Sequence, residues 1–393
     1  MKKQIAAGMI RVVVSVFVLG AFTMPPRSSA QQPKLTEFDP PNTIQASVPQ
    51  CAPFCGTFAY SINDWGVVVG SYTDTDVVPH GFLRFPDGEF LSFDAPGAGL
   101  GQDLDEGTVP YAINDWGDVT GQYQDPNLLF HGFIRYHDGS YVNFEAPGVG
   151  ENGIGTFGYS INNWGAVSGV YLDSNLAYHG FVRDPSGKIT DFDVQGAGTG
   201  AFQGTYPCEE TCINSWGEVA GFYYDGNNAT HGFVREPGGK ITMIDIPGAG
   251  TGAGQGTVVA SINDAGTTTG YWADPNYFYY AFIRTRDGKV TTFYIPSANF
   301  PGQGTVGYSL NSGDAVAGAY FDANFAYQGF ERFPCEKGNV VEFHAPHAGG
   351  GANQGTRASA NNAWGTVAGW YIDQNNLNHG FVWYPGQEAF EDK

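Results

Sequence analysis

The sequence repeats a block of about fifty residues, and this internal periodicity restricts the chain to a repeat architecture. Each block contains Ile-Asn-x-Trp-Gly or a close variant, and successive copies follow at steps of 48 to 52 residues. The Trp position is occupied by Trp65, Trp116, Trp164, Trp216, Ala265, Gly313 and Trp364. Because each copy carries the same elements, one block predicts the local structure of nearly the whole chain.

The first block, residues 56–99, alternates four short β-rich runs with turn residues. The first run ends at Ile62, and the other three cover residues 67–72, 81–85 and 89–93. Asn63-Asp64-Trp65-Gly66 is a turn sequence, with Asn able to bond its own backbone and Gly free to adopt positive φ. No window shows sustained helical periodicity. The block therefore predicts four antiparallel strands.

The whole chain is expected to be an all-β, seven-bladed β-propeller with four-stranded antiparallel blades, forming one domain over residues 31–393. The repeats lie near residues 56–99, 107–150, 155–198, 204–250, 256–299, 304–349 and 355–385. The last repeat lacks a fourth strand, and residues 34–40 (KLTEFDP) match residues 188–193 (KITDFD) of the third repeat. The N-terminal strand is therefore expected to complete the last blade and close the ring. A solenoid would instead carry atypical capping units at both ends.

Residues 1–30 have the pattern of a cleaved secretory signal. Lys2, Lys3 and Arg11 provide positive charge, residues 12–22 are apolar, and residues 28–30 are small. A retained membrane anchor is the alternative, but the apolar run is shorter than the roughly twenty residues that a membrane span needs. We expect a secreted or periplasmic protein with no membrane span after cleavage.

The formal net charge is −21, from 39 acidic and 18 basic residues, and loss of the signal makes it more negative. Such a surface repels a phosphate backbone, so no nucleic-acid partner is expected. Gly-rich connections such as residues 250–254 contain Gly-x-Gly-x-Gly. A dinucleotide fingerprint would be followed by a helix, whereas a strand follows here, so no cofactor is predicted.

The cysteine spacing points to two small disulfide loops in an exported chain. Cys51 and Cys55 share their spacing with Cys208 and Cys212, and both pairs precede an Ile-Asn turn. Cys335 would remain free. Zinc binding is the alternative, although no His lies close in sequence to either pair, and no metal site is predicted.

The repeat unit resembles the bacterial extracellular HAF repeat, which is named for His-Ala-Phe at the start of its third strand. The phrase Ile-Asn-x-x-Gly-x-Val-x-Gly is followed here by His-Gly-Phe beginning at His80, His131, His179, His231 and His379. The fifth and sixth repeats have Tyr280-Ala281-Phe282 and Gln328-Gly329-Phe330. The resemblance covers nearly all of the mature chain and implies export and a propeller-like repeat, with no assigned reaction. Trp in the first turn departs from the family, where small polar residues are usual.

An Asp follows the second strand of every repeat, and His comes six residues later in five of them. These residues are Asp74, Asp125, Asp173, Asp225, Asp274, Asp322 and Asp373. Asp and His should face each other across the hairpin, and repetition around the ring favours a bracing role over a single site. General acid–base catalysis by one pair, or a metal held by several Asp, remains the alternative.

The Asn residues of the first turns are interpreted as turn formers, and the Trp residues beside them have two interpretations. They should surround one mouth of the central channel. There they either wedge between adjacent blades or form a ring of flat apolar platforms, as sugar-binding proteins often use.

Irregular positions are better site candidates than repeated ones. Four aromatic residues with two acidic neighbours occupy the second loops of the fifth and sixth repeats, at the mouth opposite the Trp turns: Tyr277, Tyr279, Phe325, Tyr327, Asp274 and Asp322. Rings that stack on sugar faces, with carboxylates that accept hydroxyl protons, would suit a glycan.

No motif for a catalytic nucleophile is present, so no catalytic residue is assigned. The sequence predicts a secreted, monomeric, non-enzymatic propeller that binds an extracellular glycan or protein. The alternative is a secreted polysaccharide hydrolase or lyase with carboxylates at the channel mouth, because propellers host both functions.

Overall fold

The computed structural model describes residues 32–49, 51–101, 106–149, 154–208, 211–296, 302–334 and 338–386. The regular secondary structure within these ranges consists of β-strands, numbered β1 to β28. The same ranges contain no helix with the length and apolar character needed to cross a membrane. The proposed signal, residues 1–30, and Cys335 lie outside the described residues.

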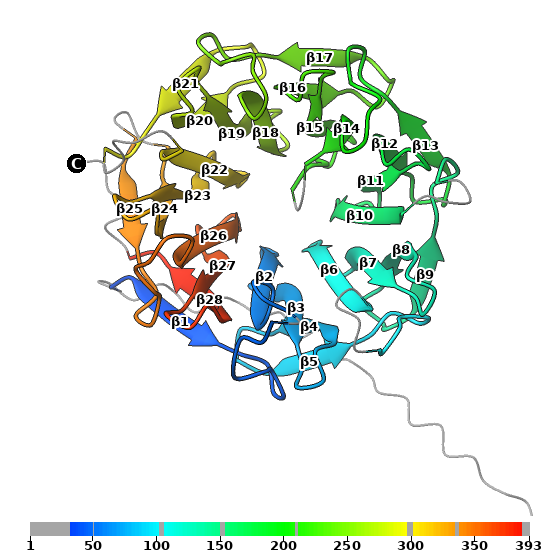
Figure 1. Ribbon diagram of the computed structural model, residues 1–393, viewed down its shortest axis with the longest axis vertical. Coiled ribbons are helices and arrows are strands. Elements are labelled where there is room, and N and C mark those ends of the chain that lie inside the picture. Colours follow the sequence, from blue (N-terminus) through cyan, green and yellow to red (C-terminus); the bar gives the residue numbers. More distant parts are fainter. Residues whose placement is uncertain are drawn as a thin grey trace, which may run out of the picture.

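The strands pair in antiparallel sets of four, each set being one blade. In blade 1, β2 (Thr57–Ile62), β3 (Val68–Thr73), β4 (Pro79–Arg84) and β5 (Phe90–Phe93) pair in sequence order. Figure 1 shows the blades arranged around a central axis, with the first strand of each blade nearest the centre. The prediction of an all-β chain of repeated four-stranded blades is confirmed, and the strand boundaries differ from the predicted ones by one or two residues.

The later blades repeat this pattern. Blade 2 contains β6 (Gly107–Ile113), β7 (Val119–Gln124), β8 (Phe130–Arg135) and β9 (Tyr141–Phe144). Blade 3 contains β10 (Gly155–Ile161), β11 (Val167–Leu172), β12 (Tyr178–Arg183) and β13 (Ile189–Phe192). Blade 4 contains β14 (Gly204–Pro207), β15 (Val219–Tyr224), β16 (Thr230–Arg235) and β17 (Ile241–Ile244). Blade 5 contains β18 (Gly256–Ile262), β19 (Thr268–Ala273), β20 (Tyr279–Arg284) and β21 (Val290–Phe293). Blade 6 contains β22 (Thr305–Leu310), β23 (Val316–Phe321), β24 (Tyr327–Arg332) and β25 (Val340–Phe343). Blade 7 contains β26 (Gly355–Asn361), β27 (Val367–Ile372) and β28 (Asn378–Tyr384).

The outer strand of blade 7 comes from the N-terminus. Strand β1 (Lys34–Phe38) pairs antiparallel with β28, from Lys34 opposite Tyr384 to Phe38 opposite Gly380. The Phe38 ring packs on Gly380 as the Phe93 ring packs on Gly81 in blade 1. The Arg84 guanidinium lies 5.0 Å from the Phe38 ring centroid. Strand β1 therefore occupies in blade 7 the place that β5 occupies in blade 1.

The core is built from one Phe per blade, contributed by the third strand and completely buried: Phe82, Phe133, Phe181, Phe233, Phe282, Phe330 and Phe381. A glycine in the second strand makes room for this packing. A Cβ on Gly70 would lie 1.9 Å from the Phe58 carbonyl oxygen and 2.8 Å from the Phe82 ring. The Gly of the repeated Val-x-Gly phrase therefore allows the Phe of His-Gly-Phe and the neighbouring first strand to pack closely against the second strand.

The turn asparagines do more than shape their own turns. Asn63 Oδ1 accepts the backbone N–H groups of Trp65 and Val67 at 3.2 and 2.9 Å, as expected for a turn former. Its Nδ2 donates to the backbone carbonyl of Asn114 in the next blade at 3.1 Å. The same interblade bond joins Asn114 to Asn162, Asn162 to Asn214, Asn214 to Asn263, Asn263 to Asn311, Asn311 to Asn362, and Asn362 to Asn63. These turns surround one end of the channel, here called the asparagine mouth.

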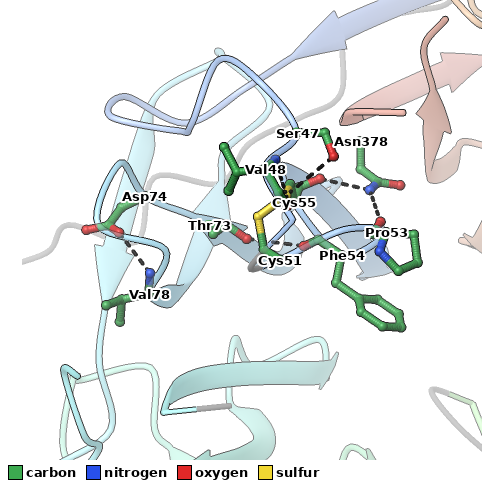
Figure 2. The surroundings of a disulfide bond; sticks show 10 residues. All are labelled: Ser47, Val48, Cys51, Pro53, Phe54, Cys55, Thr73, Asp74, Val78 and Asn378. Atoms are coloured by element: carbon green, nitrogen blue, oxygen red, sulfur yellow. Dashed lines mark hydrogen bonds between the residues drawn. A yellow bond between two sulfur atoms is a disulfide. The ribbon is translucent and has the colours of Figure 1, made fainter. Parts of the chain in front are cut away.

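Both predicted disulfides are present, Cys51–Cys55 and Cys208–Cys212. Figure 2 shows how the first one lies beside blade 7. Asn378 Nδ2, from β28, donates to the carbonyls of Pro53 and Cys55, both at 2.8 Å. The loop closed by Cys51 and Cys55 thus ties the segment before β2 to the last blade. The two pairs are disulfides and not zinc ligands.

Candidate functional site

The two candidate aspartates brace their own loops. Asp274 Oδ1 accepts the backbone N–H groups of Asn276 and Phe278 at 2.8 and 2.9 Å. Asp322 Oδ1 makes the equivalent bonds in blade 6, and its Oδ2 accepts Gln328 Nε2 at 2.9 Å. These bonds fit the bracing interpretation of the repeated Asp. Among the described residues, no group of three or more His, Cys, Asp or Glu is placed to hold a metal ion.

Tyr277 and Phe325 occupy equivalent loop positions in adjacent blades. Both have positive φ, 64° and 61°, and their carbonyls accept backbone N–H groups of the following connection, from Gly302 at 2.7 Å and Asn353 at 2.9 Å. Tyr277 and Phe325 are 42% and 37% exposed. The Tyr277 hydroxyl donates to the Ala253 carbonyl at 3.2 Å, whereas the Phe325 ring lies against Gly302. The two rings therefore cover different connections.

Tyr279 and Tyr327 begin the third strands of blades 5 and 6 and reach the channel wall. The Tyr279 ring centroid lies 5.9 Å from that of Tyr271. The Tyr327 ring centroid lies 4.9 Å from Arg357 Cζ. Of the four aromatic residues suggested by the sequence, these two pack against residues that line the cavity described next, namely Tyr271 and Arg357.

A cavity of about 330 Å³ lies in the channel, on the side away from the asparagine mouth. Its wall includes Tyr60, Tyr206, Tyr271, Tyr308, Arg357 and Trp370, and we call it the aromatic cavity. A second cavity of about 430 Å³ shares Tyr60 and continues toward Phe54 and Tyr111. Both volumes fall within or close to the range of small-molecule pockets.

Aromatic rings contact one another across five consecutive blades, and the wall residues Trp370, Tyr60 and Tyr206 are joined in this series by Tyr111 and Tyr159. Ring centroids are 5.8 Å apart for Tyr60 and Trp370, 5.4 Å for Tyr60 and Tyr111, and 5.0 Å for Tyr111 and Tyr159. The Tyr159 and Tyr206 hydroxyls are 3.0 Å apart. Blades 5 to 7 place Tyr271, Tyr308 and Trp370 on the wall of the aromatic cavity, together with smaller side chains such as Val258, Ala260 and Ser359. Most of the wall is therefore aromatic, with small side chains between the rings.

Arg357 is the only charged residue among the described residues that line the aromatic cavity. Its Cζ lies 4.9 Å from the Trp370 ring centroid and 5.2 Å from that of Tyr308. Its Nη2 donates to the Tyr308 hydroxyl at 3.1 Å. Burial raises the pKa of Tyr271, which lies on the same wall. A guanidinium in such surroundings makes stronger hydrogen bonds than one in water.

Arg357 and Trp370 were not predicted from the sequence, although aligning the blades shows that both differ from the residues at equivalent positions. The position of Arg357 is otherwise occupied by Phe58, Val109, Phe157, Tyr206, Val258 and Val306. The position of Trp370 is otherwise occupied by Ser71, Gln122, Val170, Phe222, Tyr271 and Ala319. Arg357 is the one charged residue among these seven equivalent positions. It lies on the first, inner strand of its blade and not in a loop.

The predicted Asp–His contact is confirmed, and it has a second carboxylate that the sequence analysis did not anticipate. His80 Nε2 lies 3.2 Å from Asp74 Oδ2, and His80 Nδ1 lies 2.9 Å from Asp94 Oδ1 at the end of the outer strand. The corresponding Nδ1 partners of His131, His179, His231 and His379 are Glu145, Asp193, Asp245 and Asp39. Each of these His side chains thus joins a loop to an outer strand.

The His clusters should make stability depend on pH. Hydrogen bonding to Asp94 raises the pKa of His80 and outweighs desolvation, and the pKa values of His179 and His379 are also raised. A raised folded-state pKa adds stability that is complete below about pH 6.5 and disappears as the pH rises through the folded-state value. We expect replacement of all three His by Gln to flatten the fall in melting temperature between pH 6.5 and 8.5.

Gln is the suitable substitute because Gln328 already bonds Asp322 in blade 6. Thermal denaturation followed by circular dichroism at a series of pH values measures the effect. Curves for the intact and substituted proteins that run parallel across this range would contradict the assignment.

The structure combines the two interpretations of the turn tryptophans. Trp65 Nε1 donates to the Asp115 carbonyl of the next blade at 2.9 Å. Trp116, Trp216 and Trp364 make the same bond at 3.0, 2.9 and 3.1 Å. These bonds link adjacent blades, as the wedge interpretation predicts. These four tryptophans nevertheless remain 46% to 68% exposed, and Trp164 is 72% exposed, as platforms would be.

No protein-family model matches the sequence, and no curated protein sequence matches it significantly. Among solved structures, the chain is similar to the BP39L lectin from Burkholderia pseudomallei, with a TM-score of 0.48 and 10% identity over 89% of this chain and 98% of that one. It is also similar to AofleA from Arthrobotrys oligospora (TM-score 0.43, 13% identity, 79% of this chain and 90% of that one). A puromycin hydrolase gives a TM-score of 0.46 at 13% identity, over 85% of this chain and 55% of that one. All these scores lie below 0.5, so the likeness assigns no ligand or reaction to this chain.

Proposed function

We propose that the chain is an exported, closed, seven-bladed β-propeller of the HAF-repeat type that binds a saccharide in the aromatic cavity. The interblade bonds of the turn asparagines support closure, since they include the step from Asn362 to Asn63. The bridge between Gly56 and Asn378 and the pairing of β1 with β28 support it as well. Two disulfides are consistent with an extracellular or periplasmic location.

The observation that carries the binding proposal is Arg357 in a cavity lined mostly by aromatic rings. Ring faces pack well against the C–H faces of sugars, as apolar platforms. The guanidinium supplies fixed donors for sugar oxygens and is best matched by a carboxylate. We therefore propose a short oligosaccharide that carries a uronic acid, with its carboxylate on Arg357 and a sugar ring against Trp370.

The hydrolase or lyase alternative requires paired carboxylates near the bound sugar. The described residues that line the aromatic cavity include no Asp or Glu. Binding is therefore the function that the geometry of this cavity supports best.

Two substitutions test the proposal with residues that other blades already carry. Arg357→Val introduces the residue found at Val258 and Val306, and Trp370→Ala the residue found at Ala319, so both should be compatible with the fold. We expect Arg357→Val to weaken binding of oligogalacturonate or oligoglucuronate about tenfold or more, because a hydrogen bond to a charged group contributes about 1.5–3 kcal/mol. We expect Trp370→Ala to weaken it about fivefold, because a ring contact contributes about 1 kcal/mol. Isothermal titration calorimetry measures the change.

The matched control is Tyr277→Asn with Phe325→Asn, since Asn228 and Asn376 occupy this positive-φ loop position in blades 4 and 7. Binding should be retained in this control. Normal binding by Arg357→Val and Trp370→Ala would remove the aromatic cavity as the site. Loss of binding in the loop control would instead support the site suggested by the sequence.

A further inference from the structure

The turn tryptophans form a surface that the aromatic cavity does not use. They lie at the asparagine mouth, on five consecutive blades, and we call them the tryptophan crescent: Trp364, Trp65, Trp116, Trp164 and Trp216. Asn63 Oδ1 binds the Trp65 backbone N–H, and Gly66 takes a φ of 78°, so the turn projects the indole from the mouth. Since four of the indole N–H groups donate to carbonyls of the neighbouring blade, their exposed area is mainly hydrocarbon ring.

The turn does not need tryptophan. In blade 5, Asn263 Oδ1 accepts the Ala265 N–H at 3.1 Å, and in blade 6, Asn311 Oδ1 accepts the Gly313 N–H at 2.9 Å. The same turn therefore forms with small residues. Several large exposed apolar side chains on one face of a soluble protein mark a surface that meets a partner.

The gap in the crescent is occupied by polar groups. Arg286 pairs with Glu218, with Nη2 and Oε2 2.6 Å apart, and its Nε donates to the Ala265 carbonyl at 3.0 Å. The apolar surface is thus an open arc and not a complete ring. An arc that is open at one side suits an extended chain that lies along the rings and leaves through the gap.

Acidic groups between the rings narrow the choice of partner. Asp64 and Asp115 lie in the turns of Trp65 and Trp116, Asp264 lies in the equivalent turn of blade 5, and all three line the mouth. A second copy docked face to face would bring these carboxylates together, and an anionic membrane would be repelled by them and by the net charge of −21. A neutral polysaccharide fits both features, because its C–H faces pack on indoles and its hydroxyls donate to carboxylates.

We propose that the tryptophan crescent binds a neutral polysaccharide chain. This surface lies at the opposite mouth from the aromatic cavity and does not depend on the function proposed for that cavity. The protein would hold a polymer at one mouth while the other takes a short acidic saccharide.

The test compares the intact mature chain with a variant in which all five tryptophans of the crescent are replaced by Ala, the residue native to blade 5. Binding is measured by sedimentation with insoluble cellulose, chitin, β-1,3-glucan and mannan. We expect the intact protein to bind at least one polymer, each single Trp→Ala change to weaken binding roughly fivefold, and the combined variant to bind none. Replacement by Phe should restore much of the binding, because Phe keeps an aromatic face.

The matched control is Leu91→Ala with Met243→Ala, which removes exposed apolar side chains from outer strands. It should bind the polymer like the intact protein. The proposal is overturned if the intact protein binds none of the four polymers, or if the crescent variant binds as well as the intact protein. It is also overturned if the control loses binding equally.

Two further measurements decide between partners. Sedimentation velocity that shows a dimer for the intact protein and a monomer for the crescent variant would assign the surface to self-association. Crescent-dependent binding to phosphatidylserine vesicles would assign it to a membrane. Arg357→Val should keep full polymer binding, so failure of the cavity proposal and failure of this one give different results.

Discussion

Removal of residues 31–41 is expected to cause aggregation or to lower the melting temperature by about 10 °C or more. The truncation deletes β1 and leaves β28 with an unpaired edge. It also removes the Phe38 ring from the cluster that contains Phe82 and Val382. Loss of a packed Phe alone costs about 3 kcal/mol or more, and the deleted ladder of main-chain bonds adds to this.

Polar contacts increase the expected effect. Asp39 Oδ2 lies 2.8 Å from His379 Nδ1, and Asp39 Oδ1 accepts the Thr57 hydroxyl at 2.6 Å. Glu37 Oε2 lies 2.6 Å from His347 Nδ1 in blade 6. The N-terminal segment therefore joins the sixth, seventh and first blades, so its loss affects more than one strand pair.

Differential scanning calorimetry of the mature and truncated chains measures the loss. A synthetic peptide of residues 31–41 should restore part of the stability when added to the truncated chain, whereas the same peptide with Phe38→Ala should restore much less. A truncated chain that melts like the mature one would contradict closure by this strand.

The position of β1 could be predicted because its residues repeat a pattern found elsewhere in the chain. Phe38 and Asp39 correspond to Phe192 and Asp193 of blade 3, and both pairs contact the Gly and His of their own third strands. The turn asparagines could be recognised for the same reason. A signal that recurs in each repeat needs no knowledge of the tertiary structure.

The aromatic cavity could not be predicted in this way, because it forms where inner strands from different blades converge. Strand β2 has a β-bulge between Ala59 and Ser61. The simple alternation of inward and outward side chains breaks at this point, so sequence alone does not say that Tyr60 faces the channel while Ile62 joins the core. The loops around Tyr277 were more conspicuous in the sequence, and Tyr277 takes a positive φ in its turn.

Glu331 breaks the repeat inside the core and should make the protein less stable at high pH. It is completely buried, and the equivalent residues of the other blades are all apolar: Leu83, Ile134, Val182, Val234, Ile283 and Val382. Its Oε1 accepts Asn361 Nδ2 at 3.1 Å, and Oε2 has no hydrogen-bond partner among the described residues. Asn361 replaces the Ile or Leu of the other blades, as in Ile62. A polar pair has thus replaced an apolar one between blades 6 and 7.

Burial raises the pKa of Glu331 to about 8, although the bond from Asn361 opposes the shift. The unfolded chain ionises near its ordinary value of 4.5, while the folded chain keeps the carboxyl neutral. Unfolding therefore releases a proton between these two values, and the contribution of Glu331 to stability falls as the pH rises from about 4.5 to about 8. The contribution of Glu331 to the free energy of unfolding falls by up to about 1.4 kcal/mol for each pH unit in this range.

Replacing the pair by Glu331→Val and Asn361→Leu is expected to stabilise the protein by several kcal/mol at pH 8 and by less at pH 5. Glu331→Val alone should gain less, because Asn361 would keep its bond to the Ala315 carbonyl at 3.0 Å but lose its carboxyl acceptor. Glu331→Gln should flatten the pH dependence with little change in volume. Urea denaturation at both pH values measures these differences, with the exposed Glu89→Gln as a control that should change nothing. A Glu331→Gln protein with the pH slope of the parent would show that Glu331 is not the buried neutral group, because only a carboxyl that ionises on unfolding gives that slope.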